Sequence, residues 1–480
     1  MATEDTEAAA RHAWAALGGA PELLERVTYD AVCGLPAAVP VTALGRATTA
    51  VCSLAAAELT AARSGGPVPA VRVDDAAMVT AFTSERHLLI DGRPGATFAP
   101  LSRFWPTADG WIRTHANYPH HRARLLGALG VHDSDDTDAL VARVAEELAA
   151  APGERSEQTV YAAGGLAVAV RTASAWAASE PGRAAAAQPI VQRRPAATAS
   201  TRGLTLPPAA LPAAGIRVLD LTRVIAGPVA TRTLGLLGAD VLRIDSPRLP
   251  ELADAQADTG FGKRSTALDL AVRADRDTFE ELLGGADVVV TGYRPGALDR
   301  YGLSPQALLE RRPGLIVAQL SAWGFEGPWA ERRGFDSLVQ AATGIALLQA
   351  DAEGRPGALP AQFLDHGTGY LIAAAVLRAL TDRLTADTGA GCRLRLTLAT
   401  TAAWLLDGIP ATDPPPPANH RDHSPRLAEA DSPMGRLRYA LPPIHYDGSP
   451  TTWSRPPGPP AADLPRWRPY KSENLRDPGL

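Results

Sequence analysis

The stretch that decides the fold is IRVLDLTRVIAGPVATRTLGLLGADVLRI, which covers residues 216–244. A short apolar run ends in a turn of small residues, a mostly apolar helical stretch follows, and a second short apolar run closes the unit. Short apolar runs that alternate with helical stretches are typical of βαβ units, in which the strands lie parallel. The stretch therefore predicts an α/β domain built on a parallel sheet.

The same alternation continues along the chain. Strands are predicted at six short apolar runs, residues 216–221, 239–244, 286–290, 315–320, 361–364 and 394–398. Helical stretches separate most of them, for example residues 229–237 and 370–384. Near-continuous apolar strands are expected where helices cover both faces of a parallel sheet, and we predict that arrangement here.

The N-terminal third has a different character. Long alanine-rich helices are predicted at residues 47–63 and 137–150, with a short hairpin near residues 108–112 between them. The chain also contains one internal similarity. Residues 54–59 resemble residues 372–377, and each segment is followed by a glycine-containing loop and a short strand. The similarity suggests an internal repeat, although alanine-rich helices also resemble one another by chance.

Two breaks divide the chain. Residues 192–214 are rich in Ala, Pro, Thr and Arg and read as a linker, since this composition buries little apolar surface. The second break, residues 409–425, contains four consecutive prolines, Pro414–Pro417. The predicted segments are residues 1–191, the linker 192–214, the α/β domain 215–408 and a proline-rich C-terminal segment 409–480.

Composition excludes several classes of function. The chain has 480 residues, enough for two or three domains, and its formal net charge of -5 provides no basic field for nucleic acid or an anionic membrane. Cys33, Cys52 and Cys392 match no metal spacing and no disulfide framework, which favours a reducing compartment. No apolar run approaches 18 residues and the acidic start lacks a signal-peptide core, so we expect a soluble, cytoplasmic protein.

The turn after the first predicted strand contains Val224, Ile225, Ala226, Gly227 and Pro228. A small-residue turn that enters a helix presents backbone N–H groups suited to phosphate. The plainer interpretation is that Gly227 and Pro228 only begin a helix. The Gly-x-Gly-x-x-Gly fingerprint of dinucleotide-binding proteins is absent.

A second candidate site follows the third predicted strand, at the edge of the sheet where ligands bind in α/β proteins. Arg294 and Arg300 flank a Pro-Gly turn and are able to form charge-assisted hydrogen bonds to phosphate, while Tyr293 offers a flat face for adenine. A solvated turn with two surface arginines is the alternative.

The sharpest candidate is Asp365, which follows the apolar run 361–364 and precedes a glycine-rich helix start. A helix N-terminus favours an ionised carboxylate, and glycines let a bulky substrate approach the backbone. An aspartate that only caps the helix is the alternative. We interpret His366 as structural, since it points away from its neighbour if the strand alternates.

Taken in order, these segments resemble the class III CoA-transferase family, which includes formyl-CoA and carnitine-CoA transferases and the related α-methylacyl-CoA racemases. The resemblance is collinear over residues 215–407. Its pieces are residues 218–228, 237–241, 263–270, 293–303 and 334–336, and Asp365. It implies a Rossmann-like, parallel-sheet CoA-binding domain, with a smaller, mostly helical α+β domain N-terminal to it.

The resemblance also implies a mechanism and a set of site residues. Asp365 would be the nucleophile, attacking an acyl-CoA to give a mixed anhydride and then an aspartyl-CoA thioester. Val224, Ile225, Lys263, Tyr293 and Arg300 would lie along the path of CoA, with Arg294 beside them. Acyl-CoA and a carboxylic acid would be the substrates, and no tightly bound cofactor or metal is expected.

This sequence departs from the family in its order. Residues 91–190 resemble the family's smaller domain but precede the CoA-binding domain, and residues 435–470 resemble its C-terminal return. The helix at 47–63 would belong to a truncated copy in which Ala47 stands at the place of Asp365. The family forms interlocked dimers, which this chain would partly mimic internally, so a homodimer is one option. Ser246 stands where an arginine often binds CoA.

Two other functions remain open at this point. A racemase on the same scaffold needs two opposed bases, and Phe335 stands where the racemases carry histidine, which disfavours racemisation. A catalytically idle paralogue that binds CoA or a partner is the second alternative.

Overall fold

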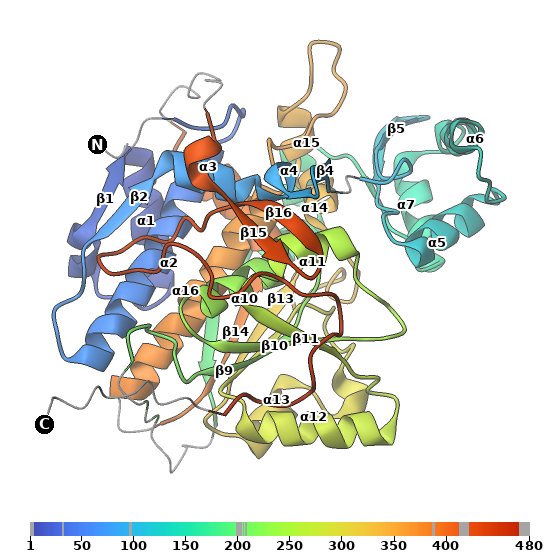
Figure 1. The fold of residues 1–480 in the computed structure, drawn as a ribbon. Helices are drawn as coiled ribbons and strands as arrows, with labels where there is room; N and C mark the ends of the chain where they lie inside the picture. Colours follow the sequence, from blue (N-terminus) through green and yellow to red (C-terminus); the bar gives the residue numbers. More distant parts are fainter. Residues whose placement is uncertain are drawn as a thin grey trace, which may run out of the picture.

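A seven-stranded sheet runs through the centre of the molecule in this computed structural model, which describes residues 4–30, 33–95, 98–197, 204, 206, 209–385, 389–411 and 422–469 (Figure 1). Its order is β11-β10-β9-β12-β13-β14-β8. Every pairing is parallel except that of β14 with β8. The strands are β8 (Gln192–Pro195), β9 (Arg217–Leu221), β10 (Asp240–Asp245), β11 (Lys263–Ala267), β12 (Val288–Thr291), β13 (Ile316–Ser321) and β14 (Cys392–Thr397).

Five of the six predicted strands are present, and the prediction of a mixed α/β fold is confirmed. Both faces of the sheet are buried, as the apolar runs required: Val218 of β9 packs into one core while its neighbour Leu219 packs into the other. The first face is covered by α10 (Ala226–Leu236) and α16 (Phe363–Thr385), and the second by α12 (Arg273–Gly285) and α13 (Pro305–Arg311).

The sixth predicted strand, residues 361–364, is wrong. The helix α16 begins at Phe363, so Asp365 lies in its first turn. A short apolar run cannot by itself distinguish a buried strand from a buried helix start. Here the Asp336 carboxylate accepts the Asp365 N–H at 2.9 Å and stabilises the helical conformation from a distant part of the chain.

The N-terminal unit is a parallel βαβ of its own. β1 (Val27–Asp30) and β2 (Val71–Asp74) pair in parallel, and α2 (Val41–Ser64) connects them. The buried α2 packs along α16, where Glu58 and Arg378 form an ion pair at 2.5 Å between the two helices. α1 (Glu4–Ala16) covers α2, and α3 (Asp75–Phe82) and α4 (Ser84–His87) lead out of the unit.

A smaller unit follows and projects from one side of the molecule, at the right of Figure 1. Its three-stranded antiparallel sheet has the order β5-β6-β7 and includes the predicted hairpin. Its elements are β5 (Phe104–Thr107), β6 (Gly110–Thr114), α5 (Pro119–Leu129), α6 (Thr137–Ala149), α7 (Gly153–Ala162) and β7 (Ala167–Ala169). Leu125, Val144 and Val160, one from each helix, are fully buried in its own apolar core.

The remaining elements connect these units. α8 (Ala173–Ala178) and α9 (Glu180–Ala186) lead to β8, whose residues Gln192–Pro195 form a strand inside the stretch expected to be a linker. Further on lie α11 (Ala253–Thr259), α14 (Asp336–Thr343), α15 (Ile345–Leu348) and α17 (Leu398–Ala403). The four prolines at 414–417 lie outside the described residues.

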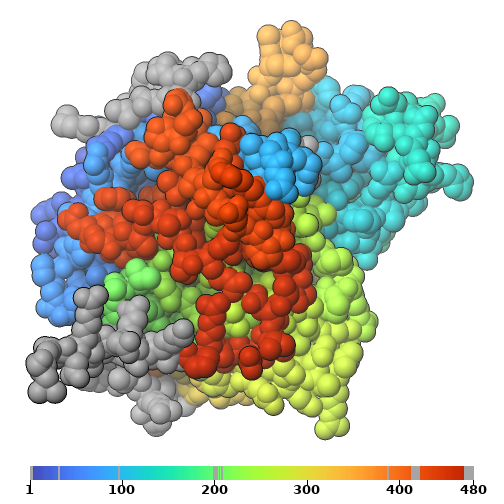
Figure 2. All heavy atoms as spheres, viewed as in Figure 1, coloured from blue at the N-terminus to red at the C-terminus, as the bar shows by residue number. Residues whose placement is uncertain are grey.

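The C-terminal segment, coloured red, crosses the face of the molecule that Figure 2 shows. β15 (Leu427–Ser432) pairs with β16 (Gly435–Ala440), and β16 pairs with β3 (Leu89–Ile90), which in turn pairs with β4 (Arg93–Pro94). Asp463 then binds both the N–H and the carbonyl of Ser265 on the edge strand β11. No described helix is long and apolar enough to span a membrane.

Candidate active site

A cavity of about 520 Å³ opens at the carboxyl edge of the main sheet, where it meets the smaller unit. Residues at or just after the ends of all six parallel strands line it, among them Leu221, Asp245, Leu268, Tyr293, Leu320 and Leu398. Tyr118, His120 and His121 of the smaller unit form the opposite wall. This edge is where ligands bind in open α/β sheets.

Asp365 lines the cavity from the first turn of α16 and is 7% exposed. Burial raises the pKa of its carboxyl well above the usual range, and the negative charges of Asp336 and Glu85 raise it further. The helix N-terminus acts in the opposite direction because it stabilises a carboxylate. The side chain therefore has the environment of a reactive carboxyl group rather than of an exposed helix cap.

Asp336 holds the start of α16 in place. One carboxylate oxygen accepts the Asp365 N–H at 2.9 Å, and the other accepts the side-chain amide of Gln340 at 2.5 Å. Gln340 in turn accepts the N–H of Leu359 at 2.8 Å and fixes the loop before α16. Burial raises the pKa of Asp336 to about 6, against the effect of these hydrogen bonds.

His366 and Glu85 lie close together on the side of Asp365 away from the cavity. His366 is fully buried beside Phe82 and does not line the cavity, and its Nε2 lies 3.6 Å from a carboxylate oxygen of Glu85 on α4. Although burial opposes it, the nearby imidazole lowers the pKa of Glu85. A carboxylate from the N-terminal unit thus contributes to the field at Asp365, which no sequence motif indicated.

The turn between β9 and α10 is organised by the buried Asp220. Its carboxylate accepts hydrogen bonds from the hydroxyls of Thr222 at 2.5 Å and Thr231 at 2.6 Å. It also accepts one from the ammonium of Lys263 at 3.1 Å, and Lys263 reaches the carbonyl of Pro228 at 2.9 Å. Burial lowers the pKa of Lys263 to about 8, against the opposing effect of Asp220. These contacts fix the turn on which Val224 lines the cavity.

The wall near Asp365 is aromatic and uncharged. Phe335, next to Asp336 in the chain, stacks on His115 with ring centres 3.7 Å apart and an interplanar angle of 2°, and meets His121 edge-on. Burial lowers the pKa of His115 to about 3 and that of His121 to about 2, so both imidazoles are neutral at physiological pH. The buried Nδ1 atoms of both rings have no hydrogen-bond partner among the described residues.

Away from Asp365 the cavity is basic. Of its arginines, Arg223, Arg248 and Arg332 are paired with Glu251, Asp269 and Glu157 respectively. Within the described part of the chain, Arg294, Arg300 and Arg333 form no ion pair with a carboxylate.

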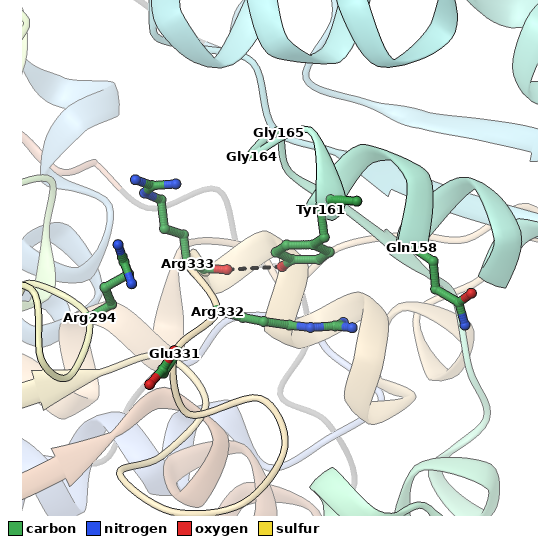
Figure 3. Close-up of a pocket in the computed structure, with 9 residues that line it drawn as sticks. Gln158, Tyr161, Gly164, Gly165, Arg294, Glu331, Arg332 and Arg333 are labelled. Atoms are coloured by element: carbon green, nitrogen blue, oxygen red, sulfur yellow. Dashed lines mark hydrogen bonds between the residues drawn. The ribbon is translucent and has the colours of Figure 1, made fainter.

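Two of these arginines also line an adjoining cavity of about 440 Å³ beside α7 (Figure 3). There the hydroxyl of Tyr161 donates to the carbonyl of Arg333 at 2.9 Å, while the guanidinium groups of Arg294 and Arg333 lie on the same side of the cavity. Burial lowers the pKa of Arg333, and the charges of Arg124 and Arg294 lower it further. Gathering like charges in this way is unfavourable unless an anion joins them.

Residues 213–439 match the sequence profile described as CoA-transferase family III. This segment, just under half of the chain, belongs to that family. The chain is 35% identical over 208 residues to an acetyl-coenzyme A transferase of Hypoxylon pulicicidum, a match that covers 42% of this chain and 35% of that protein. It is 33% identical over 195 residues to a formyl-CoA:oxalate CoA-transferase of Streptomyces coelicolor, covering 38% and 47%.

A crystal structure of a hypothetical protein from Mycobacterium tuberculosis is also similar, with 35% identity, a TM-score of 0.39, and coverage of 41% of this chain and 58% of that one. The chain spans between a third and a half of the curated family members named above.

The structure brings most of the predicted residues together. Asp365, Val224, Tyr293, Arg294 and Arg300 line the main cavity. Ile225 and Lys263 do not line it, since Ile225 is partly buried against the apolar core and Lys263 is buried with Asp220 beneath the turn.

Sequence reasoning missed the contributions of Asp336, Glu85, Glu251, Tyr118 and the histidines of the smaller unit. Only Asp336 had a signal, because it lies in one of the segments that resemble the family. The others reach the cavity through tertiary packing that no local motif encodes. Among the described residues, no cluster of three or more His, Cys, Asp or Glu side chains is arranged to hold a metal ion.

Proposed function

We propose that this protein transfers CoA from an acyl-CoA to a carboxylic acid, with Asp365 as the covalent nucleophile. The observation that carries the proposal is the position of Asp365, a carboxyl group in the first turn of a buried helix that faces a cavity at the carboxyl edge of a parallel sheet. The family relationship of residues 213–439 supports the same reaction class.

The cavity is divided in a way that fits an acyl-CoA. The parallel strands of the sheet beneath it have the order β11-β10-β9-β12-β13-β14. In doubly wound nucleotide-binding domains with this order, the ligand lies across the carboxyl edge of the sheet, near the central strands. The cations Arg294, Arg300 and Arg333 would hold the phosphates, and Tyr293 would stack on adenine. Val224 would line the pantetheine arm, while Ile225 and Lys263 would act by shaping the turn. The uncharged wall of Phe335 and His121 would receive the acyl group.

The chemistry balances without an added reagent. The Asp365 carboxylate attacks the thioester carbonyl, the C–S bond breaks, and a mixed anhydride and CoA thiolate form. The thiolate attacks the aspartyl carbonyl, releases the donor acid and leaves an aspartyl-CoA thioester. The acceptor carboxylate then expels the thiolate to form a second anhydride. Thiolate attack on the acceptor carbonyl releases the product thioester and regenerates Asp365.

Racemisation is the weaker candidate. It requires a base on each side of the α-carbon, and Phe335 occupies the position at which a histidine would be needed. His115 and His121 pack against Phe335, but burial lowers their pKa values to about 3 and about 2, which makes them poor proton acceptors. These neutral rings suit hydrogen bonding to an acyl group better than proton abstraction.

We also infer that the chain is a rearranged and partly duplicated member of the family. The unit β1–α2–β2 would be a truncated copy of the CoA-binding domain without a nucleophile. The smaller unit would supply the acyl wall of the site within the same chain, as Tyr118, His120 and His121 line one cavity with Asp365. The three cysteines are free and buried, which is consistent with a reducing compartment.

Covalent trapping tests the proposal. The protein is incubated with acyl-CoA and then hydroxylamine, which converts an aspartyl anhydride or thioester into a hydroxamate, and the peptides are analysed by mass spectrometry. We expect a hydroxamate at Asp365 that depends on acyl-CoA. Asp382, near the other end of the same helix, provides a matched control: Asp382→Ala should be labelled at Asp365 as the wild type is. An unmodified Asp365 in a protein that binds acyl-CoA would instead support a catalytically idle binder.

A further inference from the structure

The turn that faces the cavity contains an unusual backbone conformation. Val224 has φ of 70°, in the left-handed region, and it is one of only three such non-glycine residues in the described part of the chain. A β-branched side chain is strongly disfavoured there, because its Cβ crowds the backbone. Such a conformation persists only where surrounding contacts impose it.

The backbone of Val224 is hydrogen-bonded to Glu251. The Val224 N–H donates to one carboxylate oxygen of Glu251 at 3.1 Å, and Arg243 donates to the same oxygen at 3.4 Å. The other oxygen accepts the N–H of Leu252 at 3.0 Å, and the side chain of Glu251 is 1% exposed. Although burial opposes it, Arg223 and Arg243 lower the pKa of Glu251, so the acceptor is an ionised carboxylate.

The second oxygen of Glu251 also binds the smaller unit. The hydroxyl of Tyr118 donates to it at 2.5 Å, and Tyr118 is 6% exposed. The guanidinium of Arg223, which precedes Val224, lies 4.8 Å over the Tyr118 ring and 3.5 Å from Glu251. Tyr118, Arg223 and Val224 all line the cavity. The network therefore joins the acyl wall of the site to the turn.

The turn is also in contact with the helix that carries Asp365. Gly369 lies one helical turn after Asp365, and a Cβ there would approach the carbonyl oxygen of Ala226 to 2.6 Å. The backbone just after Val224 thus packs directly against the Asp365 helix, with room only for glycine. A change in the turn would be transmitted to the space between the turn and Asp365.

We propose that Glu251 and Tyr118 are positioning residues that hold Val224 in its left-handed conformation and so fix the turn that binds the CoA arm. Neither residue takes part in the chemistry. Tyr118 sets the carboxylate of Glu251 from the smaller unit, and Glu251 sets the turn. The effect on CoA rests on the proposed function, whereas the claim about the Val224 backbone does not.

The structural claim is tested first, by crystal structures of Glu251→Ala and Tyr118→Phe. Loss of the carboxylate should release Val224 to negative φ, and Tyr118→Phe should leave the turn in two conformations or displaced. A left-handed Val224 unchanged in both variants would overturn the proposal. This result needs no catalytic activity, so it stays informative even if the protein transfers no CoA.

The functional claim is tested by the affinity for CoA, measured by calorimetry. Losing a hydrogen bond to a charged group should weaken CoA binding about tenfold in Glu251→Ala and about threefold in Tyr118→Phe. Glu251→Gln keeps an oxygen for the Val224 N–H but loses the acceptor for Tyr118, so its loss of affinity should be close to that of Tyr118→Phe. If the wild type itself binds no CoA, the proposed function fails and the Val224 angle alone decides this inference.

A second substitution separates positioning from general destabilisation. In a Val224→Gly background the left-handed conformation carries no steric penalty, so adding Glu251→Ala should weaken CoA binding much less than it does alone. Asp75→Asn is the control, because Asp75 forms a buried bidentate pair with Arg46 away from the cavity. It should lower the melting temperature and leave CoA affinity unchanged. Equal losses of affinity in both backgrounds would contradict the proposal.

Discussion

Two helices packed side by side in this molecule have similar surroundings and different chemistry. α2 connects the parallel strands β1 and β2, and α16 leads into β14, which pairs in parallel with β13. Both helices are alanine-rich and almost completely buried. The fold therefore provides two comparable supports, of which only one carries a candidate nucleophile.

The difference lies within the first two turns of each helix. At the start of α16, the Asp336 carboxylate binds the backbone and Asp365 faces a cavity. Near the start of α2, Arg46 is bound by Asp75 with two contacts of 2.7 Å, and Ala47 is fully buried. A buried ion pair closes one helix end, while the other is open to a ligand. The two buried helices are similar supports, and a carboxyl group coincides with a cavity only at the start of α16.

The largest effect is expected from removing the carboxyl group on the active side of this comparison. Asp365→Ala should lower kcat for CoA transfer at least about a thousandfold, because it removes the carboxyl group on which we propose the covalent intermediate forms. CoA affinity should stay close to that of the wild type, because Arg294, Arg300 and Arg333, which we propose bind its phosphates, are untouched. Steady-state kinetics and calorimetry give the two quantities. A variant with full turnover would exclude Asp365 as the nucleophile.

The reverse substitution tests whether a carboxyl group placed on α2 could also react with acyl-CoA. Ala47→Asp places a carboxyl group in a fully buried position without a partner or cavity, and should lower the free energy of unfolding by about 3–5 kcal/mol without creating a second labelling site. Ala47→Asn has the same shape without the charge and should cost less. Denaturant unfolding measures the difference. If Ala47→Asp were as stable as Ala47→Asn and were labelled by acyl-CoA, the two helix ends would be equivalent.

The smallest effect is a shift of pH dependence. Burial and then the charge of Asp336 raise the pKa of Asp365, so the ionised nucleophile and kcat/KM should increase as pH rises through that raised pKa. Asp336→Asn removes the charge and keeps an oxygen for the Asp365 N–H, so the rise should move to lower pH. The kcat/KM profiles of the wild type and Asp336→Asn should differ above a pH of about 6, where Asp336 of the wild type is ionised.

A control for this shift is Glu85→Gln. Glu85 also raises the pKa of Asp365, but less than Asp336 does, so its variant should move the profile in the same direction by a smaller amount. Profiles that coincide with that of the wild type would mean that Asp365 does not sense these carboxylates.

The sequence predicted the parts of the fold that depend on local pattern. Apolar runs located β9, β10, β12, β13 and β14 because each strand is buried on both faces. It missed β11, whose residues KRSTA carry no apolar pattern and are stabilised by distant carboxylates. It misassigned residues 361–364 for a similar reason, since the Asp336 carboxylate that makes them a helix start is remote in sequence.

The same holds for the candidate site, where only the residues that belong to local sequence patterns were predicted. Arg294 and Arg300 follow β12, a strand that the pattern located, whereas Asp365 was found although the run before it is not a strand. All three residues line one cavity. Tyr118 and His121 depend on how the smaller unit docks, and Glu251 on its contacts with Val224 and Arg243, which no periodicity encodes. The left-handed Val224 was also out of reach, because valine is among the residues least expected in that conformation.

The covered edge of the main sheet has a consequence for solubility. An unpaired edge strand is a template on which other chains can add, and this sheet has two edges. On one, Asp463 occupies both backbone groups of Ser265, and Trp453 and Trp467 anchor the same segment through hydrogen bonds to Arg232 and Leu282. On the other, β8 presents two arginines and a proline. The C-terminal segment thus blocks the addition of another chain to β11. Without this segment, β11 would be exposed to pairing with other molecules.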